Sequence, residues 1–279
     1  MKISKKIMLS LVAVVAIGTL AACSSNKSAN GKTDVVIATD GSTQPFDYTD
    51  NQGNVTGYDI EVAREVFKHL PQYNVEFKVT DFAGITPGLD SGRFQMAAND
   101  FGWQKEREAK YNFSYPLSKS NNAVLVKSGN YSTFADLAGK KTISNPASNY
   151  TTMMKAWNDA NPNKQINIQY SSDASISNRF SQIESGQIDF MLYDKISLAS
   201  TIKDHGYSDL KIEDIKDNST PDPKHDGYEY FLFPKDQAGT QLTKDVNAEL
   251  AKLQADGTLA KLSEKYLGGN FVPDATQFK

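Results

Sequence analysis

Short apolar runs alternate with amphipathic segments along most of this chain, and that alternation restricts its fold more than any other feature. The runs have the length of buried strands, whereas the segments repeat apolar residues at helical spacing. Strands are predicted at residues 34–39, 75–79, 94–98, 123–126, 142–145, 166–170, 188–193 and 229–233, and helices at 60–70, 84–89, 149–160, 174–185, 195–201, 240–254 and 259–267. This order predicts an α/β protein with largely parallel sheets.

One predicted strand end carries the polar groups that α/β proteins use to bind small molecules. An apolar run is followed by Asn99, Asp100, Phe101 and Gly102, and then by a charged segment that contains Arg107. Backbone N–H groups are free where a strand opens toward a helix, and an arginine can donate two parallel hydrogen bonds to a carboxylate. We therefore predict that Arg107 and this elbow hold the carboxylate of a small ligand.

Arg107 and a second charged residue, Asp194, each have a simpler interpretation. Arg107 would be a solvated helix residue paired with Glu106 or Glu108. Asp194 ends a predicted strand, where it can meet an ammonium group in a cleft or cap the helix that follows. A carboxylate has enough acceptor sites for both roles, so the residues alone leave the choice open. In the same way, Asp59 is predicted to cap the helix at 60–70.

The composition excludes several classes of function. A net charge of −3 over 279 residues gives no footprint for nucleic acid. Cys23 is the only cysteine, which excludes an intrachain disulfide and a cysteine-based metal site, and His69, His205 and His225 have no ligand spacing. The sequence has no nucleophile motif and no glycine-rich phosphate loop. We therefore predict no catalytic residue, no metal and no cofactor.

Residues 1–23 have the pattern of a targeting segment. Lysines precede an apolar stretch at 7–20 that is short for a membrane span. The segment ends in Leu20-Ala21-Ala22-Cys23, which resembles the lipobox of bacterial lipoproteins, in which the cysteine receives a lipid and becomes the new N-terminus. A plain secretory peptide, with Cys23 incidental, is the alternative. Residues 24–33 are small and polar and predict a flexible tether.

Several motifs, in order, resemble the extracytoplasmic solute-binding proteins of polar amino-acid ABC transporters, family 3. Residues 57–63 (GYDIEVA) are similar to the family's Gly-Phe-Asp-hydrophobic-Asp-hydrophobic-Ala, and residues 253–258 (LQADGT) to its terminal Lys-Ala-Asp-Gly-Thr. Between them, residues 84–107 follow the family order of apolar helix, Ser-Gly-Arg, strand, polar elbow and Glu-Arg. The elbow itself departs from the usual Ser-Gly-Met-Thr. The match spans most of residues 34–267.

The resemblance implies a two-lobed fold of the type II periplasmic-binding-protein kind. Each lobe would be a mainly parallel sheet flanked by helices. Lobe 1 would comprise residues 34–118 and 230–270, and lobe 2 residues 119–229. The two chain crossings between them would form a hinge.

The resemblance also implies a role for each site residue. Arg107 would bind the α-carboxylate of the ligand, and Asp194, on the opposite lobe, its α-amino group. From the residues alone, Phe46 and Phe101 are preferred over Tyr48 and Trp103 as an aromatic wall, because both lie in loops at strand ends, although a place in the core is the more common role for any of the four. The rest of the predicted site comprises Thr43, Asn99, Asp100, Gly102, Ser148, Asn149 and Tyr150.

These features together predict a receptor rather than an enzyme. It would be lipid-anchored on the extracytoplasmic face of the membrane and would capture a polar amino acid for an ABC permease by closing its lobes. Residues 148–150 (SNY) look most like the cystine-binding branch, which makes cystine the expected ligand. Two alternatives are an extracytoplasmic cyclic-acid dehydratase on the same fold, with Asp100 or His225 as its acid or base, and a surface adhesin.

Overall fold

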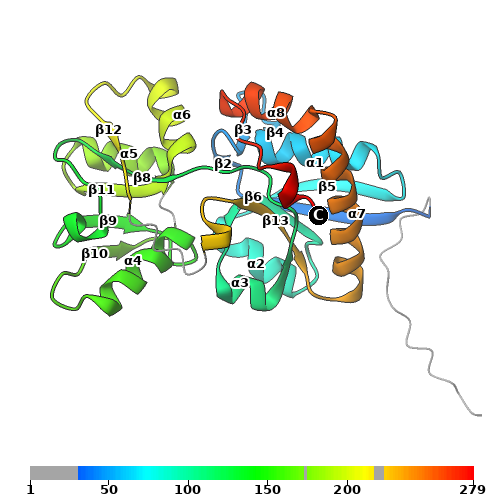
Figure 1. Ribbon diagram of the computed structural model, residues 1–279, viewed down its shortest axis with the longest axis horizontal. Helices are drawn as coiled ribbons and strands as arrows, with labels where there is room; N and C mark the ends of the chain where they lie inside the picture. The colour runs from blue at the N-terminus through cyan, green and yellow to red at the C-terminus, as the bar shows by residue number, and fades with distance from the viewer. Residues whose placement is uncertain (1–30, 173–174, 217–222) are drawn as a thin grey trace, which may run out of the picture.

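The computed structural model describes residues 31–172, 175–216 and 223–279. The predicted targeting segment with Cys23, and most of the predicted tether, lie outside the described residues. The described chain forms two α/β lobes side by side, with the second lobe in green and yellow in Figure 1. Within the described residues, no helix combines the length and the apolar character that a membrane crossing needs.

The first lobe is organised around a five-stranded sheet. Its strands, in spatial order, are β5 (Tyr73–Val79), β1 (Thr33–Thr39), β6 (Met96–Gly102), β13 (Glu229–Pro234) and β7 (Tyr111–Phe113). β1 runs parallel to β5 and β6, whereas β13 is antiparallel to β6 and β7. Because β13 returns from late in the sequence into the middle of the sheet, two separate parts of the chain build this lobe.

Helices cover both faces of this sheet because successive strand residues point to opposite sides. Val35 and Ile37 of β1 pack in one apolar cluster with α1 (Tyr58–Lys68), α7 (Gln237–Ala255) and α8 (Thr258–Leu267). Ala38 packs in another with α2 (Phe82–Asp90). The remaining elements of the lobe are α3 (Lys105–Lys110), η3 (Ala275–Gln277) and a small sheet of β2 (Ser42–Thr43), β3 (Asp47–Thr49) and β4 (Val55–Thr56).

Helix α1 begins one residue before the predicted cap. Gly57 occupies the N-cap with φ of 116°, and a Cβ there would lie 2.4 Å from the carbonyl oxygen of Phe46. Only glycine tolerates both the positive φ and this close approach. Asp59 therefore lies inside the first turn of α1 and is fully buried, which corrects its predicted role as the cap.

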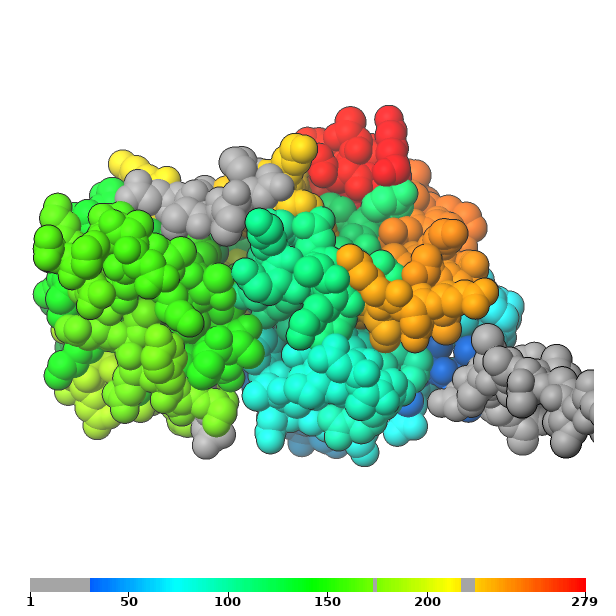
Figure 2. All heavy atoms as spheres, turned by 90° about the horizontal axis from the view of Figure 1, so that it is seen from below, coloured from blue at the N-terminus to red at the C-terminus, as the bar shows by residue number. Residues whose placement is uncertain are grey.

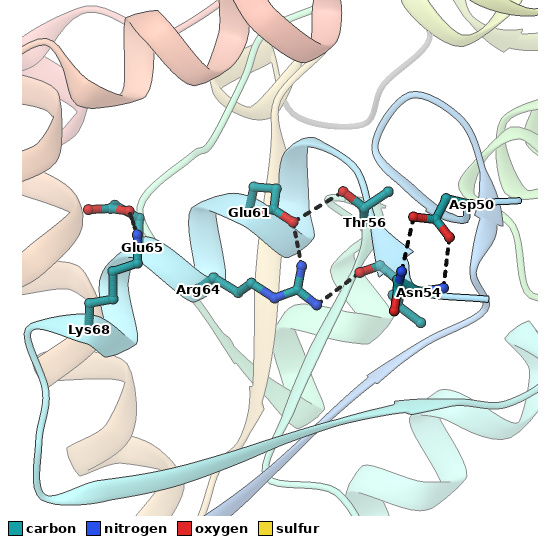
Figure 3. A network of polar contacts seen from close by, with 8 residues as sticks. Asp50, Asn54, Thr56, Glu61, Arg64, Glu65 and Lys68 are labelled. Carbon is teal, nitrogen blue, oxygen red and sulfur yellow. Dashed lines mark hydrogen bonds and ion pairs between the residues drawn. The ribbon is translucent and has the colours of Figure 1, made fainter. Parts of the chain in front are cut away.

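The solvent side of α1 fastens the small sheet to the lobe, as Figure 3 shows. Arg64 forms an ion pair with Glu61 and donates from Nη2 to the carbonyl oxygen of Val55 at 2.9 Å. The hydroxyl of Thr56 donates to Glu61 Oε1 at 3.1 Å. These contacts hold β4 against the helix and so fix the loops that lead to the β2–β3 hairpin.

The second lobe combines a parallel pair with an antiparallel sheet. β9 (Lys141–Ser144) pairs in parallel with β10 (Asn167–Tyr170), while β8 (Asn122–Val126) lies between β11 (Phe190–Asp194) and β12 (Lys211–Asp214) and is antiparallel to both. The predicted parallel pairing therefore does not hold around β8. The chain enters the lobe along β8 and runs back along β11 and β12. The other elements are η1 (Phe134–Leu137), α4 (Asn149–Ala160), α5 (Ile176–Glu184), α6 (Lys195–His205) and η2 (Pro223–His225).

Two chain segments link the lobes, and they touch each other. Lys119 and Tyr228 form an isolated antiparallel bridge, beside the predicted boundaries at 118/119 and 229/230. The second lobe (green) and the first lobe (cyan and teal) meet directly in Figure 2. A site between the lobes is therefore built from both sides.

Candidate ligand-binding cleft

Two adjoining cavities lie between the lobes. The larger measures about 530 Å³ and the smaller about 50 Å³. Asp100, Asn149 and Tyr150 line both, so the cavities share a wall. Of the predicted site residues, the larger cavity is also lined by Thr43, Asn99 and Ser148, and the smaller by Gly102 and Asp194. The volume of the larger cavity is in the range of small-molecule sites.

The predicted elbow forms the last four residues of β6, and one of them is strained. Asp100 has φ of 45°, the only positive value at a non-glycine position in the described chain, in a region that aspartate tolerates better than most residues. Its N–H donates to Oδ2 of Asp59 at 2.8 Å. Oδ1 of Asn99 accepts from the N–H of Asp40. These bonds hold the elbow in a conformation that brings Asp100 to both cavities.

Three buried carboxyl groups, those of Asp59, Asp194 and Glu229, gather beside the cleft with the half-buried Asp100. Burial raises the pKa of Asp59 to about 7 and that of Asp194 to about 6. Burial, followed by the charges of Asp194 and Asp59, raises the pKa of Asp100 well above its usual value. Burial and the charges of Asp59 and Asp100 do the same for the pKa of Glu229. Some of these groups are therefore protonated near neutral pH, which limits their mutual repulsion.

Arg107 is not the solvated residue that its charged neighbours suggest. It is only 6% exposed, and no ion pair joins it to Glu106 or Glu108, which the structure describes in full. Nη1 donates to the carbonyl oxygen of Gly102 and Nη2 to that of Ala147, each at 2.8 Å. Burial lowers the pKa of Arg107 to about 10, so it stays charged at neutral pH. Its contact with a ligand carboxylate stays a prediction.

The elbow meets the second lobe at very short range. A Cβ on Gly102 would lie 2.8 Å from Nδ2 of Asn149, across the boundary between the lobes. Two further bonds cross the same boundary: Gln104 Nε2 donates to the Thr152 hydroxyl at 3.2 Å, and Gln44 Nε2 donates to Asp204 Oδ2 at 2.7 Å. The structure is thus one in which the lobes are already in contact around the cleft.

The start of α4 brings hydroxyl and amide groups to the cleft. Ser148 is the N-cap, and its Oγ accepts from the N–H of Tyr150 at 3.2 Å. The ring of Tyr150 lies 4.7 Å from that of Tyr193, centroid to centroid. Capping is therefore observed for Ser148, and a ligand contact from residues 148–150 stays a prediction.

Asp194 acts as a helix cap in this structure. It ends β11 and its Oδ1 accepts from the N–H of Ser197 at 2.9 Å, in the first turn of α6. It also lines the smaller cavity. Its strand pairs with β8 in a register that sets Asp194 opposite Asn122, close to the hinge, which explains its position at the cleft. Binding of an ammonium group is compatible with the cap and stays a prediction.

The two rings chosen as an aromatic wall lie in the core instead. Phe46 is 1% exposed and packs edge-on against Tyr58, and Phe101 is 1% exposed and stacks on Phe82. Neither lines a cavity. Both are apolar and lie at strand ends that turn inward, where burial is worth about 1.5–3 kcal/mol per side chain. The aromatic lining comes from Phe82, Tyr150 and Tyr193 in the larger cavity and from Trp103, Tyr150 and Tyr228 in the smaller.

Sequence reasoning missed a buried arginine that lines the cleft, whereas the predicted Arg107 lines neither cavity. Arg179 of α5 is 6% exposed and lines the larger cavity. The signal was present, because Arg179 lies at the spacing of the apolar stripe formed by Ile176, Phe180 and Ile183, all buried. A charge on the inward face of a helix is unusual and needs a partner.

Two α/β lobes joined by two crossings, with a polar cleft lined from both, define a protein that binds a small solute between its lobes. The family described as bacterial extracellular solute-binding proteins, family 3, matches residues 35–269. The chain therefore belongs to this family, as the resemblance in its motifs implied.

Individual relatives fall in the amino-acid transport group of the family. The chain is 31% identical to the L-cystine-binding protein TcyA of Bacillus subtilis, over 95% of this chain and 98% of that protein. It is 30% identical to the L-cystine-binding protein TcyJ of the same organism, over 87% of this chain and 88% of that protein. None of the relatives compared supports the dehydratase or adhesin alternatives.

A solved structure shares both fold and sequence. It comes from work on the molecular and structural basis of glutathione import in Gram-positive bacteria via GshT and the cystine ABC importer TcyBC of Streptococcus mutans. The TM-score is 0.81 at 36% identity, covering 88% of this chain and 99% of that one. A putative L-cystine ABC transporter from Listeria monocytogenes superposes with a TM-score of 0.75 at 27% identity, covering 86% and 98%. The two-lobed fold is therefore that of a solute-binding protein of an amino-acid ABC importer.

Proposed function

We propose that this protein captures L-cystine outside the cytoplasm and delivers it to an ABC permease. Arg107 would bind the α-carboxylate from the first lobe and Asp194 the α-ammonium from the second. Because each charge belongs to a different lobe, a zwitterion that touches both stabilises the closed arrangement over an open one. Closure also removes water from the contacts, which strengthens them.

The observation that carries this proposal is the charge pattern of the cleft. A cavity of about 530 Å³ adjoins a smaller one, and together they are lined by carboxylates of both lobes, among them Asp100 and Asp194, and by the guanidinium of Arg179 from the second lobe. An uncharged solute would leave these buried charges unmatched. The ligand named for the relatives TcyA and TcyJ supports cystine within the class of zwitterions.

Glutathione is a second candidate ligand. The solved structure from the work on glutathione import is 36% identical to this chain. Its glutamyl end carries an amino group and a carboxylate on one carbon, as each end of cystine does. The same clamp of Arg107 and Asp194 would therefore hold either molecule.

A thermal-shift screen tests the ligand. It would compare the twenty common amino acids, cystine and glutathione, with the protein kept free of reductant. A ligand present at a hundred times its Kd stabilises the folded state by ~2.7 kcal/mol. We expect a clear rise in melting temperature with cystine and little or none with single amino acids. If an ordinary amino acid gives the largest rise and cystine none, the proposed ligand is wrong.

We further propose that Cys23 anchors the protein to the membrane surface through a lipid. The apolar stretch and the Leu-Ala-Ala-Cys ending of residues 20–23 support this. Each buried methylene of a lipid chain contributes ~0.8 kcal/mol, so a diacylglycerol would give stable anchoring. Labelled fatty acid should enter the wild type and not Cys23→Ser, which should appear in the culture medium. Equal labelling of the two proteins would contradict lipidation at Cys23.

A further inference from the structure

Arg179 is a buried charge whose Nε atom has no hydrogen-bond partner in the described structure. Its guanidinium carbon lies 5.0 Å from the centroid of the Tyr193 ring. The guanidinium group also has the Tyr193 side chain as a hydrogen-bond partner. No ion pair joins Arg179 to a carboxylate of the described chain. Burial lowers the pKa of Arg179.

The other three arginines of the chain are each accounted for by contacts within the protein. Arg64 pairs with Glu61, Arg93 donates to the carbonyl oxygen of Gly84 and lies over the ring of Phe94, and Arg107 donates to two carbonyl oxygens. Arg179 alone keeps a buried N–H unused while it lines a cavity of about 530 Å³. A buried, unpaired cation is costly, and an anion that enters the cavity removes that cost.

The position of Arg179 restricts which ligands can bring an anionic group to it. Asp194 lines the smaller cavity and Arg179 the larger, with the shared wall of Asp100, Asn149 and Tyr150 between them. A ligand with its amino group at Asp194 must therefore extend past this wall to reach Arg179. A short amino acid whose side chain ends in a neutral or cationic group would leave Arg179 unpaired.

We propose that Arg179 binds a second carboxylate, at the far end of an elongated amino-acid ligand, and thereby selects ligands that carry one. The planar fork of an arginine suits a carboxylate. This inference rests on the proposed function and deepens it, because cystine and glutathione both have a second carboxylate.

Four disulfides of L-cysteine differ only in the charged groups at the far end of the ligand, so they show which of these groups Arg179 recognises. Cystine has both a second carboxylate and a second ammonium group. The mixed disulfide with 3-mercaptopropionate has only the carboxylate, that with cysteamine only the ammonium group, and that with ethanethiol neither. Binding would be measured by calorimetry for wild type, Arg179→Gln, Arg179→Lys and a surface control, Arg93→Gln. A Cys23→Ser background removes the only thiol, so the ligands cannot exchange with the protein.

We expect the wild type to bind cystine and the 3-mercaptopropionate disulfide more tightly than the other two. Arg179→Gln should weaken these two by about thirtyfold or more and leave the ethanethiol disulfide within about threefold. Arg179→Lys should recover part of the loss, and Arg93→Gln should change nothing. Glutathione, measured in parallel, should follow the carboxylate-bearing disulfides if it is a ligand.

Two other results would overturn the inference, and they differ in what they say about the proposed function. If the wild type binds cystine but Arg179→Gln weakens all the disulfides equally, Arg179 only supports the fold, and the inference is overturned while the proposed function stands. If no disulfide and no glutathione binds the wild type, the proposed function fails and the subsite fails with it.

Discussion

The guanidinium of Arg107 in the first lobe donates from Nη2 to the carbonyl oxygen of Ala147 in the second lobe, at 2.8 Å. One charged residue thus already bridges the lobes through the backbone. For Arg107 to bind a ligand carboxylate, the carboxylate must replace this carbonyl oxygen or share the remaining N–H groups of the guanidinium. If Arg107 binds the ligand as proposed, ligand binding and contact between the lobes would be coupled at this residue.

Replacing Arg107 should weaken ligand binding strongly. Loss of a buried partner leaves the carboxylate of the ligand unpaired, at a cost of about 2–5 kcal/mol. Arg107→Ala should therefore reduce affinity for cystine by more than an order of magnitude in calorimetry. Arg93→Ala removes an arginine that is exposed on the same lobe and serves as the control. Unchanged affinity in Arg107→Ala would remove this residue from the ligand site.

Asp194→Asn should separate an ammonium contact from a helix cap. Asparagine keeps the acceptor for the N–H of Ser197 and caps helices about as well, so the melting temperature without ligand should change little. Affinity for the free zwitterion should fall by tenfold or more. N,N′-Diacetylcystine, acetylated at both ends, has no ammonium group, so it should bind the wild type weakly and lose little in the variant. Equal losses for both ligands would show that Asp194 is not the ammonium partner.

Gly102→Ala should oppose closure of the lobes without unfolding either one. The new Cβ would lie 2.8 Å from Nδ2 and 3.2 Å from Cγ of Asn149, and all its close neighbours belong to that one side chain. Overpacking of this kind costs about 1–3 kcal/mol. We expect weaker ligand binding in Gly102→Ala. In the double variant with Asn149→Ala, the effect of the alanine at 102 should largely disappear. Additive effects of the two substitutions would contradict a direct clash.

Stability without ligand should fall as pH rises toward neutrality. Burial raises the pKa of Asp47, Asp59, Asp100, Asp194 and Glu229, to about 7 for Asp59 and about 6 for Asp194. Between the ordinary carboxyl pKa of about 4 and these values, the folded state binds more protons than the unfolded state, so each rise in pH favours unfolding. The melting temperature should be higher at pH 5 than at pH 7.5.

A variant tests whether these carboxyls cause the pH dependence. Glu229→Gln removes one of the titrating groups and should flatten the curve of melting temperature against pH. A melting temperature that rises steadily from pH 5 to 7.5 in the wild type would contradict the assignment. Salt-dependent changes at the surface are controlled by holding ionic strength constant.

Much of the architecture was predictable because it follows from local pattern. The alternation of apolar runs and helical stripes predicted an α/β protein, and the motifs predicted two lobes of this family, which the comparisons confirm. Strand direction was not predictable in the same way. The antiparallel pairing of β8 depends on where the chain crosses between lobes, and no local pattern reports that.

The lining of the cavities was predictable where polar residues lie at strand ends and much less so elsewhere, and ligand contacts of these residues stay predictions. Asp194, Asn99 and Asp100 do line the cavities. Phe46 and Phe101 were assigned to the cleft because loops are usually exposed, but the loop of Phe46 folds inward and Phe101 lies within β6, so both rings are buried. Arg179 was overlooked because the apolar stripe around it predicts only core packing. Whether a charge on such a stripe faces a core or a cavity depends on the opposite lobe.

Trp103 gives the cleft an optical signal of its own. Its indole stacks on the imidazole of His225, with 4.9 Å between centroids and 3° between planes, and it lines the smaller cavity. The only other tryptophan, Trp157, packs on Phe134 inside the second lobe, where a movement of the lobes leaves its surroundings unchanged. Emission from the unlabelled protein therefore divides into a constant part and a part that responds at the cleft. The intrinsic fluorescence can therefore follow binding of a solute to the protein in real time, with no dye attached.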